Sequence, residues 1–310
     1  MFETITEYAS AKIPFLFFTN FQGDKLTIFK LDELEKNGIE YSIKKAKKNH
    51  PHIRLKKNPI SFKEYKVKFD KFIIQIKKGN TYLGNLTQPT PIECDLNLKE
   101  IFDIANADYK LHVKDKFVCF SPEPFITIQD NIIKTYPMKG TIDASLVDAR
   151  TLILENEKEM AEHIMIVDLL RNDLSIVAKE VRVDKFRFTQ KIKAGEKELL
   201  HVSSEISGKL KEDWQNNLGD IIKKLIPAGS ISGTPKKSTV EILEDIEGYK
   251  RDYFSGIFGV FDGKSLQTSV MIRFIEKRDA TLVYKSGGGI TLDSDARSEY
   301  QEMLDKIYIP

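Results

Sequence analysis

Between residues 253 and 291 the chain consists of apolar, extended segments joined by very short turns. Asp262-Gly263 and Arg278-Asp279 separate three such segments. An Asp-Gly pair between apolar runs is a strong hairpin signal, so the sequence predicts a three-strand meander here. Residues 115–137 have a similar pattern, which predicts a strand, a kink, a second strand, a turn at Asp130-Asn131 and a third strand.

Amphipathic helices are mixed with these hairpins. Apolar residues at steps of three and four predict helices over 61–79 and 155–179. Further helices are expected at 216–225 and at the C-terminal end. Another is expected directly after the loop "PAGSISGTPK", with Thr234 as its N-cap and Pro235 in its first position. Hairpins mixed with helices, rather than strict alternation of strand and helix, favour an α+β fold over a doubly wound sheet.

The 310 residues show no repeat and no flexible linker, and 41% hydrophobic with 30% charged residues is ordinary globular composition. We therefore expect a single domain over 1–310, with a short N-terminal subregion (about 1–60) and a core (about 61–310). Two strands around Gly23-Asp24 are expected in the subregion. A net charge of +2 does not indicate a nucleic-acid partner, and the basic run 42–57 is interpreted as a solvated face rather than a polyanion site.

Two features indicate the cellular compartment. The two cysteines, Cys94 and Cys119, lack the spacing of a metal site and fit a reducing compartment. The first residues are acidic with only a short apolar patch, unlike a signal peptide, and no apolar stretch approaches membrane-spanning length. We expect a cytoplasmic protein that does not contact membranes.

The last helix contains a candidate cation site. Glu299, Glu302 and Lys306 follow one another at steps of three and four, so they project from one helix face. The two carboxylates could bind Mg²⁺, or Glu302 and Lys306 could form a solvated ion pair. The preceding "SGGGI" (286–290) favours a ligand site, because consecutive glycines expose backbone N–H groups to an anion.

Two other charged positions are ambiguous. Glu162 lies beside the apolar stripe of the second long helix, and by itself is a weak ligand candidate; Asp168 and Arg171 are expected to form an internal salt bridge. Lys139 lies in "PMKG" (137–140), where proline and glycine indicate a turn. Its side chain either points into water or acts as a nucleophile.

Nine ordered motifs resemble those of the chorismate-utilising enzymes, which include component I of anthranilate synthase and of aminodeoxychorismate synthase and the isochorismate and salicylate synthases. The resemblance covers roughly residues 60–310. It implies two mostly antiparallel β-sheets packed together and flanked by helices. The motifs are GNTYLGNLTQ (79–88), SPEPF (121–125), PMKGT (137–141), AEHIMIVDLLRNDL (161–174), HVSSEISGKL (201–210), PAGSISGTPK (227–236), YFSGIFGVFD (253–262), TSVMIRF (268–274) and SGGGITLDSDARSEYQE (286–302).

The resemblance also implies roles for individual residues. Glu162 and Glu302 match the family's Mg²⁺ ligands, with Glu299 nearby and acting through water. Arg273 matches the arginine that faces the enolpyruvyl carboxylate of chorismate. Lys306 and the Gly288-Gly289 backbone help to bind carboxylate, and Tyr253 is a further substrate contact. Glu123 matches the general acid/base that serves the C4 hydroxyl, and His201 matches a histidine near that end.

Two positions distinguish the branches of the family. Isochorismate and salicylate synthases use a lysine base where this chain has Leu83, so water activation by that route is not expected. The segment "PMKGT" resembles P-I-K-G-T of aminodeoxychorismate synthases rather than P-I-A-G-T of anthranilate synthases. This resemblance implies that Lys139 is a covalent nucleophile. Its amine must be neutral to attack, and we expect burial or a nearby cation to lower its pKa.

The resemblance therefore implies an Mg²⁺-dependent aminodeoxychorismate synthase component I, with ammonia supplied by a separate glutamine amidotransferase subunit. Anthranilate formation is the alternative within the same fold, and a non-catalytic chorismate-binding subunit is the alternative outside catalysis. The retained set of Glu123, Lys139, Glu162, His201 and Glu302 argues against the second alternative. No tryptophan feedback site is identified in residues 1–60.

Overall fold

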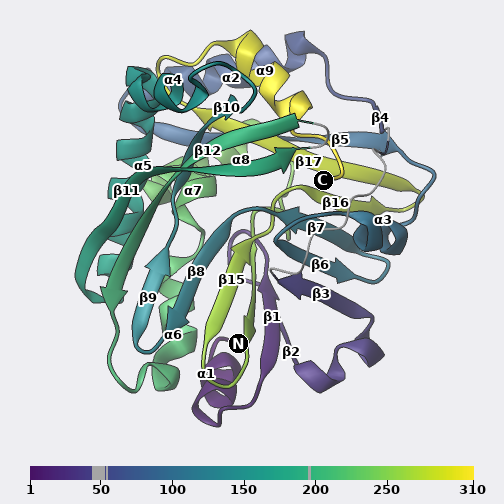
Figure 1. The fold of residues 1–310 in the computed structure, drawn as a ribbon. Coiled ribbons are helices and arrows are strands. Elements are labelled where there is room, and N and C mark those ends of the chain that lie inside the picture. Colours follow the sequence, from purple (N-terminus) through teal and green to yellow (C-terminus); the bar gives the residue numbers. More distant parts are fainter. Residues whose placement is uncertain (44–52, 54, 195–196) are drawn as a thin grey trace.

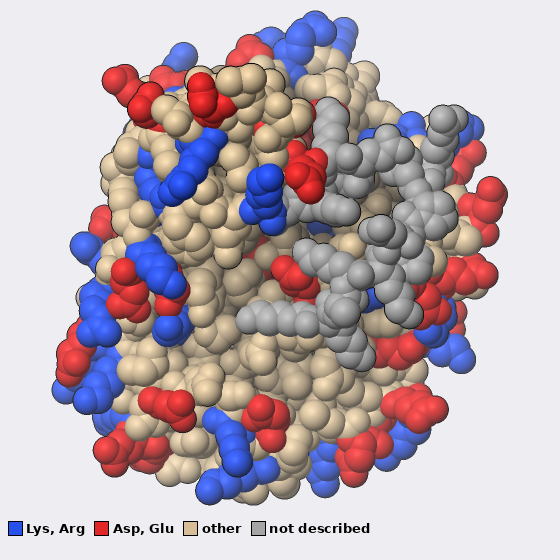
Figure 2. Space-filling view, in the orientation of Figure 1, with Lys and Arg blue, Asp and Glu red and all other residues tan. Residues whose placement is uncertain are grey.

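The computed structural model describes residues 1–43, 53, 55–194 and 197–310. Most of the basic run 42–57 lies outside the described residues, and so does the interpretation of that run as a solvated face. On the face of the molecule that Figure 2 shows, Lys and Arg side chains are interspersed with Asp and Glu.

Two β-sheets form the centre of the molecule, and every strand pair recorded between described residues is antiparallel. The first sheet has the order β10-β12-β9-β8-β15-β14-β1-β2, with β11 also paired to β12. Its strands are β1 (Phe15–Thr19), β2 (Leu26–Lys30), β8 (Pro124–Gln129), β9 (Ile132–Thr135), β10 (Met138–Asp143), β11 (Lys179–Ala194), β12 (Lys197–Lys209), β14 (Ile257–Phe261) and β15 (Leu266–Val270).

The second sheet has the order β13-β5-β17-β16-β7-β6-β3, with β4 also paired to β5. Its strands are β3 (Ile39–Ile43), β4 (Lys56–Lys57), β5 (Leu83–Glu93), β6 (Tyr109–Val113), β7 (Phe117–Ser121), β13 (Gly233–Thr234), β16 (Phe274–Arg278) and β17 (Thr281–Ile290). The predicted α+β fold with two antiparallel sheets and flanking helices is confirmed.

Helices cover the outer faces of both sheets (Figure 1). They are α1 (Glu3–Ser10), α2 (Phe62–Lys77), α3 (Leu98–Ile104), α4 (Ala149–Glu155), α5 (Glu157–Ser175), α6 (Leu218–Leu225), α7 (Gly229–Ser232), α8 (Lys236–Glu247) and α9 (Ala296–Asp305). Helices α4 and α5 lie against β10 and β12, whereas α8 and α9 lie against β5 and β17. The amphipathic pattern explains this placement: in α2, for example, Tyr65, Phe69 and Phe72 are buried on one face.

The two sheets pack together through aromatic side chains. Strand β1 is buried on both faces: Phe15 and Phe17 join the core under α1 and α6, while Leu16 and Phe18 join the core between the sheets. The ring of Phe18 from the first sheet meets that of Phe117 from the second edge to face, at 5.8 Å between centroids. A strand covered on both faces explains why this segment is apolar without alternation.

The predicted meander over 253–291 is wrong in one respect. The segment between the two turns is not one strand, because it breaks at residues 271–273 into β15 of the first sheet and β16 of the second. The kink expected in 115–137 makes the reverse passage, from β7 in the second sheet to β8 in the first. Both hairpin turns near the break, and the turn at Asp130-Asn131 with φ of 48° and 61°, occur as predicted.

Two glycine-containing segments belong to strands: "PMKG", which was expected to be a turn, and "SGGGI", which lies in the third strand of the predicted meander. "PMKG" enters β10, where the pairing with β12 slips by one residue between Met138 and Thr141. The glycines of "SGGGI" lie inside β17 and pair with β5, so that Gly288 is opposite Leu86. Their backbone is therefore part of a sheet and is not an open loop.

The start of α8 also differs from the prediction. Its N-cap is Pro235, with an extended ψ of 136°, and no side chain caps the helix. Thr234 instead pairs with Leu83 as part of β13, so its backbone belongs to the second sheet. The preceding loop "PAGSISG" contains the single turn of helix α7.

Residues 1–60 contribute strands to both sheets, because β1 and β2 belong to the first and β3 to the second. The expectation of one domain over 1–310 stays a prediction. Among the helices in the described part of the chain, none is long and apolar enough to cross a membrane.

Candidate active site

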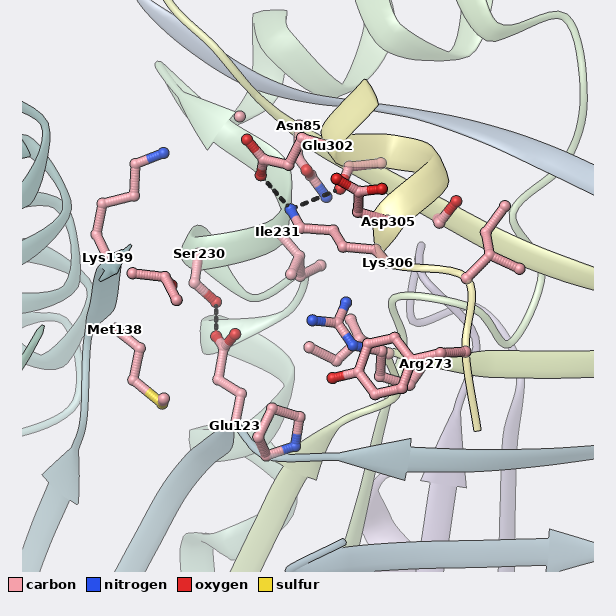
Figure 3. A pocket seen from close by; sticks show the side chains of 18 of the residues that line it. Asn85, Glu123, Met138, Lys139, Ser230, Ile231, Arg273, Glu302, Asp305 and Lys306 are labelled. Atoms are coloured by element: carbon pink, nitrogen blue, oxygen red, sulfur yellow. Dashed lines mark hydrogen bonds and ion pairs between the residues drawn. The ribbon is translucent and has the colours of Figure 1, made fainter. Parts of the chain in front are cut away.

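A cavity of about 1520 Å³ opens where the two sheets meet α7 and α9. Figure 3 shows Lys139 extending from β10 on one side of it, with Arg273 and Lys306 on the opposite side. Leu83, at the start of β5, also lines the cavity. The predicted site residues that line it are Glu123, Lys139, His201, Arg273, Gly289, Glu302 and Lys306.

Glu123 and Arg273 lie at the two points where the chain passes between the sheets. Glu123 separates β7 from β8, and Arg273 precedes β16 with a φ of +50°. The two passages are joined by hydrogen bonds, since Val270 N–H donates to the Glu123 carbonyl and Phe120 N–H donates to that of Arg273. Strands that change sheets at one corner thus place an acid and a guanidinium on the same cavity wall.

Burial raises the pKa of the Glu123 carboxyl, although a hydrogen bond from Ser230 and the charges of Arg273 and Lys306 partly oppose the shift. The Ser230 hydroxyl of α7 donates to Glu123 Oε1 (Figure 3). A carboxyl whose pKa is raised in this way can hold a proton closer to neutral pH and release it to a leaving group.

Lys139 is paired with Glu162 of α5 at 2.7 Å between Nζ and Oε2. Burial works to lower the pKa of Lys139, but Glu162, joined by Glu302 and Glu159, outweighs burial and raises it. The expectation that the Lys139 pKa is lowered is therefore wrong for the structure, because the groups that bury the amine are carboxylates.

The carboxylates of α9 lie over the glycines of β17. A Cβ atom added to Gly288 would lie 3.2 Å from Glu299 Oε2 and 3.4 Å from Glu302 Oε1, and one added to Gly289 would lie 3.7 Å from Lys139 Nζ. The missing side chains leave this space free for charged groups. A Cβ at Gly288 would crowd the carboxylate of Glu299, whereas one at Gly289 would make only ordinary van der Waals contacts.

Lys306 ends α9 and faces the cavity. Its Nζ lies 2.6 Å from Glu302 Oε1 and donates to the Gly287 carbonyl at 2.9 Å. Burial lowers the pKa of Lys306, with Arg273 and Lys139 adding to the shift and Glu302 opposing it. The predicted Glu302–Lys306 pair is therefore present, but it lines the cavity instead of the outer surface.

His201 lies on β12, where its Nε2 is 3.3 Å from the Thr141 hydroxyl. Burial, together with the positive charges of Arg273 and Lys306, lowers the pKa of His201 to about 4. The imidazole is therefore neutral at pH 7 and can donate or accept one hydrogen bond at each nitrogen.

The carboxylates around Lys139 fit a hard divalent cation in donor chemistry. Glu299 Oε2 and Glu159 Oε2 are buried and have no hydrogen-bond partner among the described residues, and carboxylate oxygens are the ligands that Mg²⁺ prefers. No three His, Cys, Asp or Glu side chains of the described ranges form a group that holds an ion as they stand. Mg²⁺ commonly needs only one or two protein carboxylates, with substrate and water supplying the rest.

Sequence reasoning missed Glu159. It lies one turn before Glu162 on α5, lines the cavity, and its pKa is raised by burial and by the charges of Glu162 and Glu302. The step of three residues between Glu159 and Glu162 is the same as that between Glu299 and Glu302. This repeated spacing was the available signal.

Some predicted residues lie away from the cavity. Tyr253 does not line it: its ring packs on Phe117 at 5.2 Å between centroids, against the core between the sheets. The predicted Asp168–Arg171 salt bridge is present at 3.1 Å on the exposed side of α5. Glu162, Glu299 and Gly288 are not among the residues that line the cavity, but they lie close to residues that do, such as Lys139 and Glu302.

The profile of a family described as "chorismate binding enzyme" matches residues 18–310. A protein of Haemophilus influenzae named "Uncharacterized PabA-like protein" is 48% identical over 314 residues, which cover 99% of this chain and 95% of that protein. The match begins earlier than residue 60, where the motif resemblance starts.

Enzymes with a named activity are more distant in sequence or are similar in structure. "Aminodeoxychorismate synthase component 1" of Bacillus subtilis is 32% identical over 201 residues, which cover 62% of this chain and 42% of that protein. The structure of anthranilate synthase component I from Streptococcus pneumoniae superimposes with a TM-score of 0.71 at 24% identity, over 84% of this chain and 60% of that one. At this identity the superposition shows the fold alone.

Proposed function

Because the chain belongs to the chorismate binding enzyme family, we propose that it is a component I of aminodeoxychorismate synthase. In this proposal it aminates chorismate at C4 with ammonia and yields 4-amino-4-deoxychorismate, a precursor of para-aminobenzoate and folate. Anthranilate formation within the same family is the alternative, since it begins from the same substrate. A non-catalytic chorismate-binding subunit is the more distant one.

The observation that carries the proposal is the position of the Lys139 amine. It reaches the cavity from β10, 27% of its side chain is accessible, and its Nζ lies over Gly289 on the floor formed by β17. The amine is therefore within reach of a ligand held by the opposite wall.

The charges on that wall suit a dicarboxylate such as chorismate. Arg273 offers a planar guanidinium, whose Nε is buried without a partner in the described part of the chain. Lys306 adds an ammonium group beside it. In the proposed complex Arg273 takes the enolpyruvyl carboxylate, while Lys306 and the β17 backbone face the ring carboxylate.

The proposed reaction has two substitutions. The neutral Lys139 amine adds to C2 of the ring and becomes a substituted ammonium. Both conjugated ring double bonds shift, and the C4–O bond breaks as Glu123 donates its proton to the departing hydroxyl, which leaves as water. Ammonia then adds at C4, the two double bonds shift back, and the C2–N bond breaks so that Lys139 leaves as a neutral amine. The new ammonium group at C4 returns a proton to Glu123. Chorismate and ammonia thus give aminodeoxychorismate and water, and the enolpyruvyl ether is kept.

The Lys139 amine must first lose its proton and leave Glu162, since the structure shows it as the charged partner of that carboxylate. We assign Glu159, Glu162, Glu299 and Glu302 as the groups that would hold Mg²⁺. The ion, when bound, would neutralise charge on the ring carboxylate and on these side chains.

We also propose that ammonia comes from a separate glutamine amidotransferase subunit and that the pair works in the cytoplasm. The described residues contain two free cysteines, Cys94 and the fully buried Cys119. Burial raises the pKa of the Cys119 thiol, which makes it a poor nucleophile for glutamine hydrolysis.

The test is product identification. The purified chain is incubated with chorismate, Mg²⁺ and ammonium, and separately with glutamine and a glutaminase subunit, and products are identified by mass spectrometry. We expect aminodeoxychorismate in both cases. Anthranilate with release of pyruvate would select the alternative enzyme, and no turnover in either case would select the non-catalytic subunit.

Lys139→Ala tests the covalent step. We expect this variant to lose more than about 1,000-fold in kcat with ammonium, because an alanine cannot form the C–N bond that displaces the hydroxyl. Lys158→Ala is the matched control, since Lys158 also approaches Glu162, at 4.0 Å, but is exposed. Equal activity of Lys139→Ala and wild type would rule out covalent catalysis.

A further inference from the structure

The strands on both sides of β12 carry bulges that lie two residues apart along β12, opposite Val202 and Ser204. In β10 the residues Lys139 and Gly140 form a one-residue bulge between the pairs Met138–Ser203 and Thr141–His201. In β11 a second bulge lies between Lys185 and Phe188, opposite Ser204. A bulge leaves backbone polar groups without their ladder partners, and these groups need other partners when they are buried.

The side chains of His163 and Ser204 supply a hydrogen-bond partner to one backbone group of each bulge. The Arg187 N–H of the β11 bulge donates to Ser204 Oγ at 2.9 Å. Ser204 Oγ lies 2.7 Å from His163 Nε2, and His163 Nδ1 lies 3.3 Å from the Lys139 carbonyl of the β10 bulge. His163 and Ser204 are fully buried, so water does not compete for these bonds.

The direction of the bonds follows from the groups involved. A carbonyl can only accept, so His163 Nδ1 carries the proton and donates to the Lys139 carbonyl. Ser204 Oγ accepts from Arg187 and keeps its own proton for His163 Nε2. The imidazole thus links the two bulges through β12.

Helix α5 consequently holds Lys139 at both ends. His163 binds the backbone carbonyl of Lys139, and its neighbour Glu162 binds the side-chain amine at 2.7 Å. We propose that His163 is a positioning residue for Lys139. Together with Ser204, His163 fixes the β10 bulge and thereby the position of the Lys139 amine in the cavity. The expected effect on kcat rests on the proposed function, whereas the expected effect on the position of the Lys139 amine does not.

Two substitutions separate the two bonds of His163. The amide nitrogen of Asn lies near the place of Nδ1, so His163→Asn can keep the donor to Lys139 and lose the bond to Ser204. The amide of Gln reaches the place of Nε2, so His163→Gln can keep Ser204 and lose Lys139. Both variants replace a buried imidazole by an amide, which makes each the control of the other.

The first readout is steady-state kinetics with chorismate and ammonium. We expect His163→Gln to lower kcat about 100-fold with KM for chorismate within about threefold of wild type, because a misplaced reactive group costs rate rather than binding. His163→Asn should keep kcat within about tenfold. A role in stability alone would affect both variants alike.

The second readout does not depend on any activity. Amine acetylation at low reagent concentration is followed at the Lys139 peptide by mass spectrometry, with the exposed Lys158 as internal reference. In His163→Gln the amine leaves its pair with Glu162, so we expect several-fold faster labelling of Lys139 than in wild type. His163→Asn should label as wild type does, and so should His112→Gln, a buried histidine of β6 that contacts Glu40.

The inference is overturned if the two His163 variants lose activity equally, or if neither changes Lys139 labelling. Should neither variant fold, Ser204→Ala takes their place, with faster Lys139 labelling expected and unchanged labelling contradicting the proposal. If wild type makes no aminodeoxychorismate, the proposed function fails, while the labelling comparison still decides whether His163 positions Lys139.

Discussion

Lys139 shows how far a single position can be interpreted from its neighbours. Pro137 and Gly140 indicate a turn, and the structure has instead a strand that carries a bulge, with Gly140 at a φ of +97°. Turns and bulges use the same residue types, since both need unusual backbone angles. Which of them forms depends on whether a partner strand, here β12, lies alongside.

The charge state of Lys139 likewise could not be predicted from the residues around it in the sequence. Its raised pKa results from carboxylates of α5 and α9, which are distant in the chain. Proximity of charges is a property of the folded arrangement, and the same lysine beside apolar residues would have had a lowered pKa.

His201 makes folding stability depend on pH. Its pKa is about 4 in the folded protein because of burial and of Arg273 and Lys306, against about 6.5 when unfolded. Between these values the unfolded chain binds a proton and the folded chain does not. The stabilisation is therefore complete above about pH 6.5 and is lost as the pH falls toward 4, by at most about 1.4 kcal/mol per pH unit.

The measurement is urea unfolding of wild type and of His201→Gln at several pH values from 7.5 to 4.5, chosen to span the two pKa values. We expect the free energy of unfolding of the variant to decline less steeply across this window. Parallel curves would show that His201 is not protonated on unfolding in this range.

At the scale of elements, the positions of the long helices were predicted closely. Of the side chains that these helices direct toward the cavity, only some were recognised. Helix α2 begins at the Ser61–Glu64 capping box and ends before Gly79, close to the predicted bounds. In α5 the apolar stripe was found, but Glu159 was not, because a carboxylate on a helix flank is ordinarily a solvated one. The metal-binding role proposed for Glu159 rests on the folded arrangement, in which α9 places Glu302 close enough to raise the pKa of Glu159.

The bulge in β10 depends on Gly140. An alanine there would have a φ of +97° and a Cβ 3.0 Å from Glu159 Oε2, so we expect Gly140→Ala to destabilise the fold by about 1–2 kcal/mol. It should also lower kcat, because the same bulge holds Lys139. Thermal unfolding and steady-state kinetics measure the two effects.

Gly79→Ala is the matched control for this substitution. Gly79 has a φ of +74° after α2, and a Cβ there would meet nothing within 4 Å. We expect a comparable loss of stability without loss of kcat. A similar kcat in the two variants would show that the β10 bulge does not position Lys139.

At the scale of the whole molecule, the cavity exists because two strands change sheets at one corner. The sequence showed a kink after Ser121 and no sign of the break at 271–273, since Met271 and Ile272 continue an apolar, strand-like run. Apolar runs do not reveal which sheet they join. Glu123 and Arg273 were therefore recognised only through the family motifs.

A buried ion pair connects the parts of the fold around this corner. Arg251 bonds Glu247 of α8 at 2.6 Å and the carbonyls of Ile231 in α7 and Asn85 in β5, and its guanidinium lies 4.4 Å from the Phe21 ring. We expect Arg251→Met to destabilise the protein by about 3–5 kcal/mol, because it leaves the Glu247 charge buried and uncompensated.

Urea unfolding of Arg251→Met, Glu247→Gln and the double variant measures this effect. The double variant should be more stable than the sum of the two single losses implies, since no unpaired charge remains in it. Lys66→Met, which breaks the exposed Lys66–Asp70 pair of α2, should change little. Strict additivity of the two buried substitutions would contradict a charge-pair origin.

Local sequence by itself determined the helices, the tight hairpins and the α+β class, because side-chain periodicity and turn residues act over a few positions. The order of nine motifs determined the family. Only the tertiary structure decided that the glycines of 287–289 pair with β5, that Tyr253 packs against the core between the sheets, and that Lys139 faces Glu162. Each of these depends on contacts between segments distant in the chain, and no local pattern encodes such contacts.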